Sequence, residues 1–152
     1  MPAFELNIFI DRSRNDVYDH LSEPINMIGL QPYLTTIDIL KEQKDAAGGV
    51  LRPFYMVETY RWLGLPIFRS RVYTVIHLTS PKREIIIRQY RKPGIQVAYQ
   101  YEFHEIEESR THLVQKTFFE KVDKLLERAV YKRANTAQRA LLTNLKVRLE
   151  KQ

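Results

Sequence analysis

The chain has 152 residues, of which 44% are hydrophobic, and a formal net charge of +6. This length and apolar content fit one globular domain over residues 1–152, and no linker rich in proline, glycine or serine divides it. The absence of cysteine excludes disulfides, a thiol nucleophile and thiolate-ligated metals. No secretion signal opens the sequence, and no apolar run approaches the about 18 residues that span a bilayer. We therefore expect a soluble, cytoplasmic protein.

The positive charge is concentrated near the C-terminus. Residues 121–152 contain nine Lys/Arg against three Asp/Glu, whereas residues 1–120 contain fifteen of each. A basic helix can bind phosphates or anionic lipid headgroups, but a helix with one buried face also carries charge on its solvent face. We adopt the second explanation and expect no specific binding of nucleic acid.

The predicted elements are one strand, two short helices, six further strands and one long helix. Residues 4–10 alternate between apolar and polar, as in a strand with one buried face. Asp11 or Ser13 is suited to cap a first helix that includes residues 16–21, and Pro24 is suited to open a second. The later strands are predicted at 33–41, 50–62, 67–78, 83–91, 96–106 and 110–119. Because short turns join most of them, we expect an antiparallel sheet.

From about Glu120 the apolar residues recur at helical spacing over roughly thirty residues, a length of about 45 Å. No glycine or proline interrupts this segment. Its small residues, among them Ala129, would let the helix approach the strands closely or leave room beside it. The pattern predicts an α+β fold in which a curved, seven-stranded antiparallel sheet wraps around the C-terminal helix.

The chain resembles the START-like, helix-grip superfamily (SRPBCC), which includes polyketide cyclases/dehydrases and lipid-transport proteins. The resemblance rests on the element order, the opening strand at 4–10, the helix with Val17, Tyr18 and Leu21 ahead of Glu23-Pro24, and the long terminal helix. It covers essentially the whole chain and includes no short catalytic motif. It implies a hydrophobic cavity between sheet and terminal helix that takes a lipid, isoprenoid or polyketide-like molecule.

The register of the last hairpins predicts which side chains line this cavity. If the last hairpin turns at Glu108, residues equally far from it face one another, as Tyr101 and Gln115 do. Tight turns at 92–94 and 81–82 extend the same face, which is apolar with a few polar groups and suits a ligand pocket. Together with Ala129, the predicted ligand-binding residues here are Thr74, Ile76, Ile87, Gln89, Tyr99, Tyr101, Gln115 and Thr117. Alternatively, the tyrosines only pack in the core.

The third strand has apolar residues on both faces, and its composition favours Met56, Glu58 and Tyr60 as further ligand-binding residues. Glu58 would then lie beside aromatic side chains, where burial favours the protonated carboxyl and suits it for general acid or base catalysis. It is our candidate catalytic residue for a cyclase or dehydratase. The alternative is that Glu58 pairs with Arg61 or Arg71 on the outer face.

The sequence gives little support for a metal site or for a bound cofactor. His104 and His112 face one another across the last hairpin, on the outward side and without an evident third ligand, so we predict no metal site. No glycine-rich loop precedes a helix, which removes the phosphate-cradling motifs. We expect no cofactor.

The predicted hairpin tip at 62–68 is almost wholly apolar, although such tips are normally polar. Trp62, Leu63, Leu65 and Phe68 are suited to contact a membrane transiently, to cap the cavity or to form a dimer contact. Alternatively, the tip folds back over the core. The sequence is compatible with a monomer or a homodimer.

Three functions remain. A carrier of a small hydrophobic molecule needs only the cavity, and we favour it. A cyclase or dehydratase needs a positioned acid or base. A partner-binding module, like relatives that chaperone coenzyme Q or act on ribosomes, would use the basic helix and the apolar tip.

Overall fold

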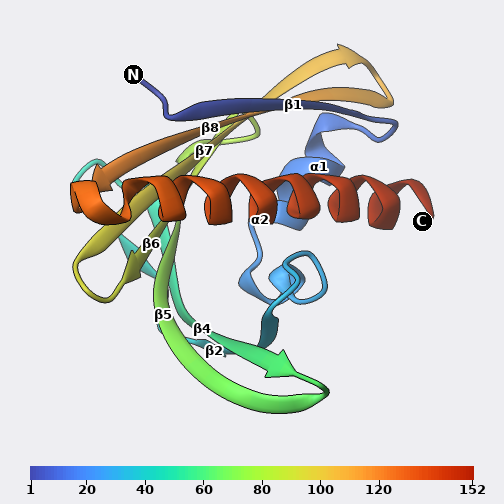
Figure 1. The fold of residues 1–152 in the computed structure, drawn as a ribbon. Helices are drawn as coiled ribbons and strands as arrows, with labels where there is room; N and C mark the ends of the chain where they lie inside the picture. The colour runs from blue at the N-terminus through green and yellow to red at the C-terminus, as the bar shows by residue number, and fades with distance from the viewer.

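The structure is a computed structural model that describes residues 1–152, except for the side chains of residues 60–62 and 66–68. The elements are β1 (Phe4–Ile10), α1 (Arg14–Leu21), the 3-10 helix η1 (Pro24–Met27), β2 (Leu34–Ile39), β3 (Gln43–Lys44), β4 (Val50–Trp62), β5 (Leu65–Ser80), β6 (Glu84–Arg91), β7 (Ile95–Glu107), β8 (Arg110–Lys121) and α2 (Lys124–Glu150). The strands form one antiparallel sheet in the order β1-β8-β7-β6-β5-β4-β2. Figure 1 shows this sheet curving around α2.

The predicted α+β helix-grip architecture is confirmed, with two differences in detail. The sheet has eight strands, because Gln43 and Lys44 pair with Leu51 and Val50 beside the loop that follows. Helix α2 begins at Lys124 and not near Glu120. The reason is that β8 continues as far as Lys121, after which the Asp123 carboxylate accepts a hydrogen bond from the Leu125 amide at 3.0 Å and caps the helix.

The predicted strand registers are confirmed. Tyr101 lies opposite Gln115, and His104 lies opposite His112. The short turns fix these pairings, because a slip of one residue would turn every apolar side chain to solvent. At the N-terminal end of α1, Ser13 and not Asp11 is the cap, and its hydroxyl accepts a hydrogen bond from the Asp16 amide at 3.1 Å.

The two halves of α2 differ in burial. The C-terminal half packs on the sheet with a stripe at helical spacing: Ala134, Gln138, Leu141, Leu142, Leu145 and Leu149. Its last turns are fixed to the end of β1, where Lys146 Nζ donates to the Phe9 carbonyl at 2.6 Å and the Asp11 amide donates to Glu150 Oε2 at 2.9 Å. The N-terminal half, up to residue 133, is mostly exposed. In the part of the chain that the structure describes, no helix is both long and apolar enough to cross a membrane.

Candidate functional site

The side of the sheet that faces α2 is an apolar wall. Contacts with the helix identify this side, because Phe4 and Phe119 pack edge-on against Tyr131 of α2. Directly paired residues share a face, so each cross-strand row can be followed over the sheet. One row is Ile76, Ile87, Tyr99, Thr117 and Phe4, and the next is Phe54, Thr74, Gln89, Val97 and Phe119.

Most of the predicted ligand-binding residues lie together on this wall. Those that are buried on it are Met56, Glu58, Thr74, Ile76, Ile87, Gln89, Tyr99, Tyr101, Gln115 and Thr117. Ala129 does not join them and is exposed, because it lies in the half of α2 that extends beyond the sheet contacts. Tyr60 lies outside the described side chains.

A buried ion pair interrupts the apolar wall. Glu58 on β4 is only 4% exposed, and its Oε1 lies 2.5 Å from Nη1 of Arg91, the last residue of β6. Arg91 Nη2 also donates to Gln89 Oε1 at 3.2 Å. Arg71, one of the two outer-face partners considered for Glu58, bonds to Asp38 instead, at 3.3 Å. Arg61, the other, lies outside the described side chains.

Tyr99 on β7 belongs to the same region. It is 4% exposed, and its hydroxyl forms no hydrogen bond with any side chain that the structure describes. Burial raises the pKa of Tyr99 to about 12, while the positive charge of Arg91 acts to lower it and the negative charge of Glu58 to raise it. The ion pair and this hydroxyl together offer hydrogen-bond donors within an apolar surrounding.

A second polar group connects the wall with α2. The Tyr101 hydroxyl donates to Oε1 of Gln138. Burial raises the pKa of Tyr101 well above its usual value, so the phenol stays protonated. Beside it, Gln115 Nε2 donates to Thr117 Oγ1 at 2.7 Å, and the Gln115 Oε1 atom is buried without a partner among the described residues. Exchanging the two amide atoms would leave Nε2 without a partner instead, so one buried amide group stays unsatisfied either way.

No family model matches the sequence, and no curated protein does. Solved structures match over nearly its full length. A START superfamily protein from Mycobacterium smegmatis is 14% identical, with a TM-score of 0.70 and 97% of each chain covered. The Zhui aromatase/cyclase from Streptomyces sp. R1128 is 15% identical, with a TM-score of 0.64, 96% of this chain and 94% of that one. The chain has a START-like, helix-grip fold.

A two-domain protein also matches over about half of its length. The di-domain aromatase/cyclase StfQ of the steffimycin biosynthetic pathway is 16% identical, with a TM-score of 0.62. The match covers 95% of this chain and 49% of StfQ. At such low identity these similarities establish the START-like fold, and the site must be argued from its own residues.

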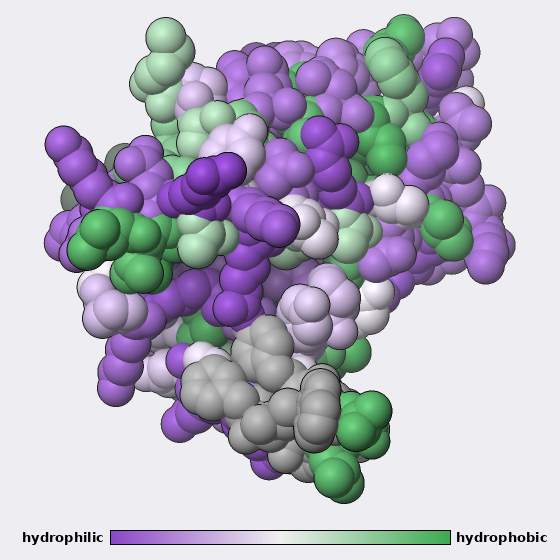
Figure 2. Space-filling model, in the orientation of Figure 1, coloured by the Kyte–Doolittle hydropathy of each residue, from purple (hydrophilic) through white to green (hydrophobic). Residues whose placement is uncertain are grey.

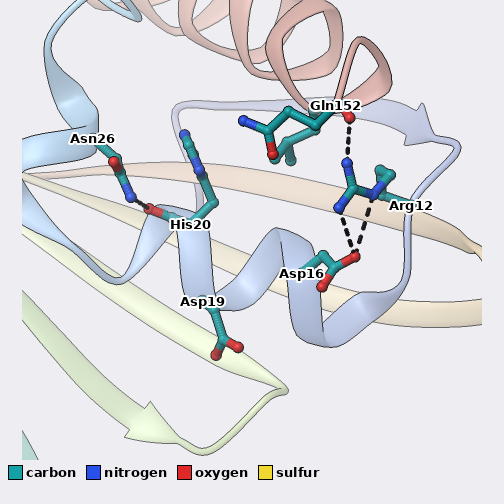
Figure 3. A pocket seen from close by; sticks show the side chains of 7 residues that line it. Arg12, Asp16, Asp19, His20, Asn26 and Gln152 are labelled. Carbon is teal, nitrogen blue, oxygen red and sulfur yellow. Dashed lines mark hydrogen bonds and ion pairs between the residues drawn. The ribbon is translucent and has the colours of Figure 1, made fainter.

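The protein also has a shallow surface pocket of about 270 Å³ between α1 and the end of α2 (Figure 3). Arg12 in this pocket binds Asp16 at 2.9 Å and the Leu149 carbonyl at 2.6 Å, which joins α1 to the end of α2. Burial, followed by the nearby charges of Arg148 and Arg12, lowers the pKa of His20 at its edge. We interpret this pocket as a structural junction.

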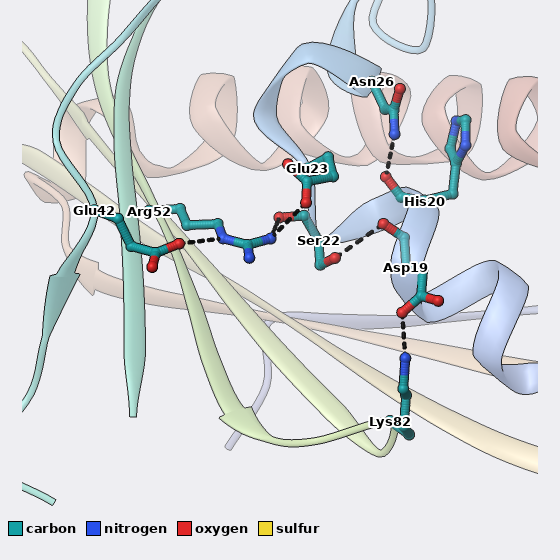
Figure 4. A network of polar contacts seen from close by, with 8 residues as sticks. All are labelled: Asp19, His20, Ser22, Glu23, Asn26, Glu42, Arg52 and Lys82. Carbon is teal, nitrogen blue, oxygen red and sulfur yellow. Dashed lines mark hydrogen bonds and ion pairs between the residues drawn. The ribbon is translucent and has the colours of Figure 1, made fainter. Parts of the chain in front are cut away.

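A neighbouring polar network holds α1 and η1 against the sheet (Figure 4). Arg52 of β4 bridges Glu23 and Glu42, each at 2.9 Å, and Lys82 binds Asp19. These ion pairs are exposed, so each contributes little stability alone, but together they fix the corner formed by residues 11–33. We assign this network a structural role too.

The predicted histidine pair lies on the outer face. His112 Nε2 lies 2.8 Å from Asn7 Oδ1, and His104 Nε2 lies 3.5 Å from Glu102. Outside the undescribed side chains at 60–62 and 66–68, no three His, Asp or Glu residues are grouped as a metal site requires.

Two site residues escaped the sequence analysis. Arg91 ends its strand next to the 92–94 turn, and its pairing with Glu58 passes over β5, so no local pattern indicates it. The sequence did contain an indication of Gln138, because this residue occupies the buried stripe of α2, between Ala134 and Leu141, where the helical spacing predicts an apolar residue.

Proposed function

We propose that this START-like protein binds and carries a small hydrophobic molecule that ends in an oxygen-bearing polar group, such as a lipid, an isoprenoid or a polyketide-like compound. The supporting observation is the combination on one wall of apolar rows with one ion pair, Glu58–Arg91, and the buried side chain of Tyr99. The ligand would lie between sheet and α2, with its polar end toward Arg91.

Apolar contact would supply most of the affinity. Ile76, Ile87 and Met56 present branched and flexible side chains, and each CH₂ group that a ligand buries against them contributes about 0.8 kcal/mol. Such contact discriminates poorly among similar chains. A wall of this kind therefore selects a broad class of molecule.

The polar group would provide orientation. A guanidinium has five N–H donors, and the described contacts of Arg91 use one toward Glu58 and one toward Gln89. A ligand carbonyl or carboxylate oxygen would accept hydrogen bonds from the remaining donors and from the Tyr99 hydroxyl. A hydrogen bond that involves a charged group contributes about 1.5–3 kcal/mol.

The ion pair also favours a carrier over a cyclase or dehydratase. A general acid must be free to reach the reacting atoms of its substrate, and Oε1 of Glu58 is already engaged by Nη1 of Arg91 at 2.5 Å. Similarity to aromatase/cyclases keeps the enzyme as the second candidate. In that case Glu58 would act as a base and the phenol of Tyr99 as a proton donor.

The carrier would meet its source of ligand at the tip of the β4–β5 hairpin. Leu63 and Leu65 are exposed there by 81% and 68%. We propose that they contact a membrane transiently. Trp62 and Phe68, which were predicted to share this role, lie outside the described side chains.

Two measurements test this function. Native mass spectrometry of the protein from its own host, followed by organic extraction, should reveal a reproducible apolar ligand. Separately, a fluorescent long-chain fatty acid should bind about 10- to 100-fold more tightly than its methyl ester, and Arg91→Met should remove the difference. Arg71→Met, which changes an arginine on the outer face, is the matched control. No binding of either probe, and no co-purified ligand, would reject the carrier.

A further inference from the structure

We infer that one edge of the curved sheet docks on an anionic lipid surface, and that the exposed first half of α2 supplies the electrostatic contact. This inference deepens the proposed carrier function, on which it rests, by naming the surface at which the ligand would be exchanged. It follows from three features: the edge of the sheet to which the segments belong, the exposed cations Lys124, Arg128 and Lys132, and the exposed leucines.

Strand direction places these features along the same edge of the sheet. β4, β6 and β8 are mutually parallel, because one antiparallel strand separates each from the next. Their C-terminal ends therefore form one edge of the curved sheet, which begins beside the start of α2 at the left of Figure 1 and bends round to the β4–β5 tip at the lower right. The turn at 63–64, the turn at 92–94 and the first turns of α2 all belong to this edge.

Three cations in the first turns of α2 form no ion pair with the described residues. Lys124, Arg128 and Lys132 are exposed, follow one another at intervals of four residues on α2, and appear in no ion pair. Residues 121–133 hold five Lys/Arg against two Asp/Glu. One of the two acids, Asp123, is engaged as the helix cap. Lys92, in the turn beside Ile95, adds a further exposed cation.

One exposed leucine lies among these cations. Leu125 is 92% exposed and shares the solvent face of α2 with Arg128 and Lys132, three and seven residues later. Figure 2 shows an apolar patch bordered by hydrophilic side chains at the left, where α2 begins in Figure 1. A leucine this exposed contributes nothing to the core and is available to an external partner.

The β4–β5 tip gives independent support. Leu63 and Gly64 have φ angles of 51° and 80°, so both occupy the left-handed region. A two-residue hairpin turn of this kind prefers Asn-Gly or Asp-Gly, because a side chain such as leucine is strained there. The chain thus places an apolar residue at an exposed position that local conformation disfavours, and Leu65 extends the same apolar surface.

This combination fits lipid better than nucleic acid. Both partners present phosphates to the cations, but RNA gains affinity from stacking and hydrogen bonding, to which leucine contributes little. A bilayer gains from each leucine that enters its interface and from each cation near anionic headgroups. The partner is therefore an anionic membrane surface, with the sheet edge toward the bilayer.

Vesicle co-sedimentation tests the inference without any ligand. The full chain should bind vesicles of phosphatidylcholine and phosphatidylserine, bind pure phosphatidylcholine vesicles much less, and lose binding as salt is raised. Neutralising three cations, in Lys124→Gln/Arg128→Gln/Lys132→Gln, should weaken binding on the order of 100-fold. The matched control removes the same charge from the other end of the sheet and the end of α2: Lys41→Gln/Lys44→Gln/Lys151→Gln.

Two further substitutions test the leucines. Leu125→Gln should weaken vesicle binding several-fold, whereas Ile106→Gln, at a 46% exposed position on the opposite edge, should not. Leu63→Asn suits the left-handed turn better than leucine, so any loss of vesicle binding cannot come from unfolding.

The possible outcomes are distinct. Equal effects of both triple variants would overturn the inference, and so would RNA binding that exceeds vesicle binding and depends on the same cations. Vesicle binding that follows the predicted pattern while no apolar ligand is ever found would reject the carrier function alone.

Discussion

The hydroxyl of Tyr101 in the middle of the sheet donates a hydrogen bond to Oε1 of Gln138 on α2, and both side chains are at most 1% exposed. This bond lies on the side of the sheet where the ligand is proposed to bind. It fixes both the rotation of the helix and the position of a polar group in the core. An unpaired amide at this depth would be costly, so the two residues depend on each other.

Tyr101→Phe should lower the free energy of unfolding by about 1–3 kcal/mol, because it leaves the Gln138 amide buried without its donor. The double variant Tyr101→Phe/Gln138→Leu should recover most of this loss, since it removes both polar partners. Urea unfolding followed by circular dichroism measures both. A double variant less stable than Tyr101→Phe would show that Gln138 has other essential contacts.

We expect Tyr99 to make the free energy of unfolding fall as the pH becomes alkaline. Its pKa is about 12 in the folded protein, against an ordinary tyrosine value of 10.0, so the folded state retains a proton that the unfolded chain loses. The stabilising contribution is complete below about pH 10, declines between about pH 10 and 12 and is lost above that range. Two pKa units correspond to about 3 kcal/mol.

Tyr99→Phe should therefore flatten the loss of stability between about pH 9 and 12, as measured by urea unfolding. Tyr90→Phe, at a position 37% exposed on the outer face, provides the control. The prediction is wrong if both variants lose stability as steeply as the wild-type protein.

Arg91→Met should destabilise the protein by about 2–4 kcal/mol at neutral pH, because it leaves the Glu58 carboxylate buried without a cation. The double variant Arg91→Met/Glu58→Leu should regain much of this energy, because it removes the uncompensated charge. A double-mutant cycle that includes Glu58→Leu isolates the coupling between the two side chains. Additive effects would mean that the pair contributes no coupling energy.

The predictable parts of this structure are those that local chemistry determines. The alternation around Glu108 and the length of its turn specified the pairing of Tyr101 with Gln115, because only one register buries the apolar side chains. The length of α2 and its apolar stripe followed from helical spacing. The first residue of α2 could not be predicted from this spacing, because β8 continues to pair up to Lys121 and Asp123 caps the helix only after that.

The unpredictable parts are contacts between segments far apart in sequence. The pairing of Glu58 with Arg91 depends on how two strands on either side of β5 place their ends, which no local pattern encodes. The exposure of Ala129 depends on how far α2 extends beyond its contacts with the sheet, and alanine is compatible with either environment. Side-chain type alone therefore could not assign Ala129 to the site.

Gly29 depends on a similar distant contact. It has a φ angle of 87°, and a methyl group there would lie 2.6 Å from Arg148 Nη2 of α2. Arg148 donates to the carbonyls of Asn26 and Ile28, each at 2.6 Å, and so fixes the loop after η1 to the helix. Gly29→Ala should lower the free energy of unfolding by about 2–3 kcal/mol, through backbone strain and through displacement of the guanidinium.

Gly48→Ala separates these two causes. Gly48 has nearly the same φ angle, 86°, but open space around its Cα, so alanine there should cost only the strain of about 1 kcal/mol. Urea unfolding of both variants gives the difference that is due to Arg148. If Arg148→Met is introduced first, Gly29→Ala should cost no more than Gly48→Ala. Equal costs in the wild-type background would instead show that the guanidinium moves aside freely and that its two carbonyl contacts contribute little to holding α2.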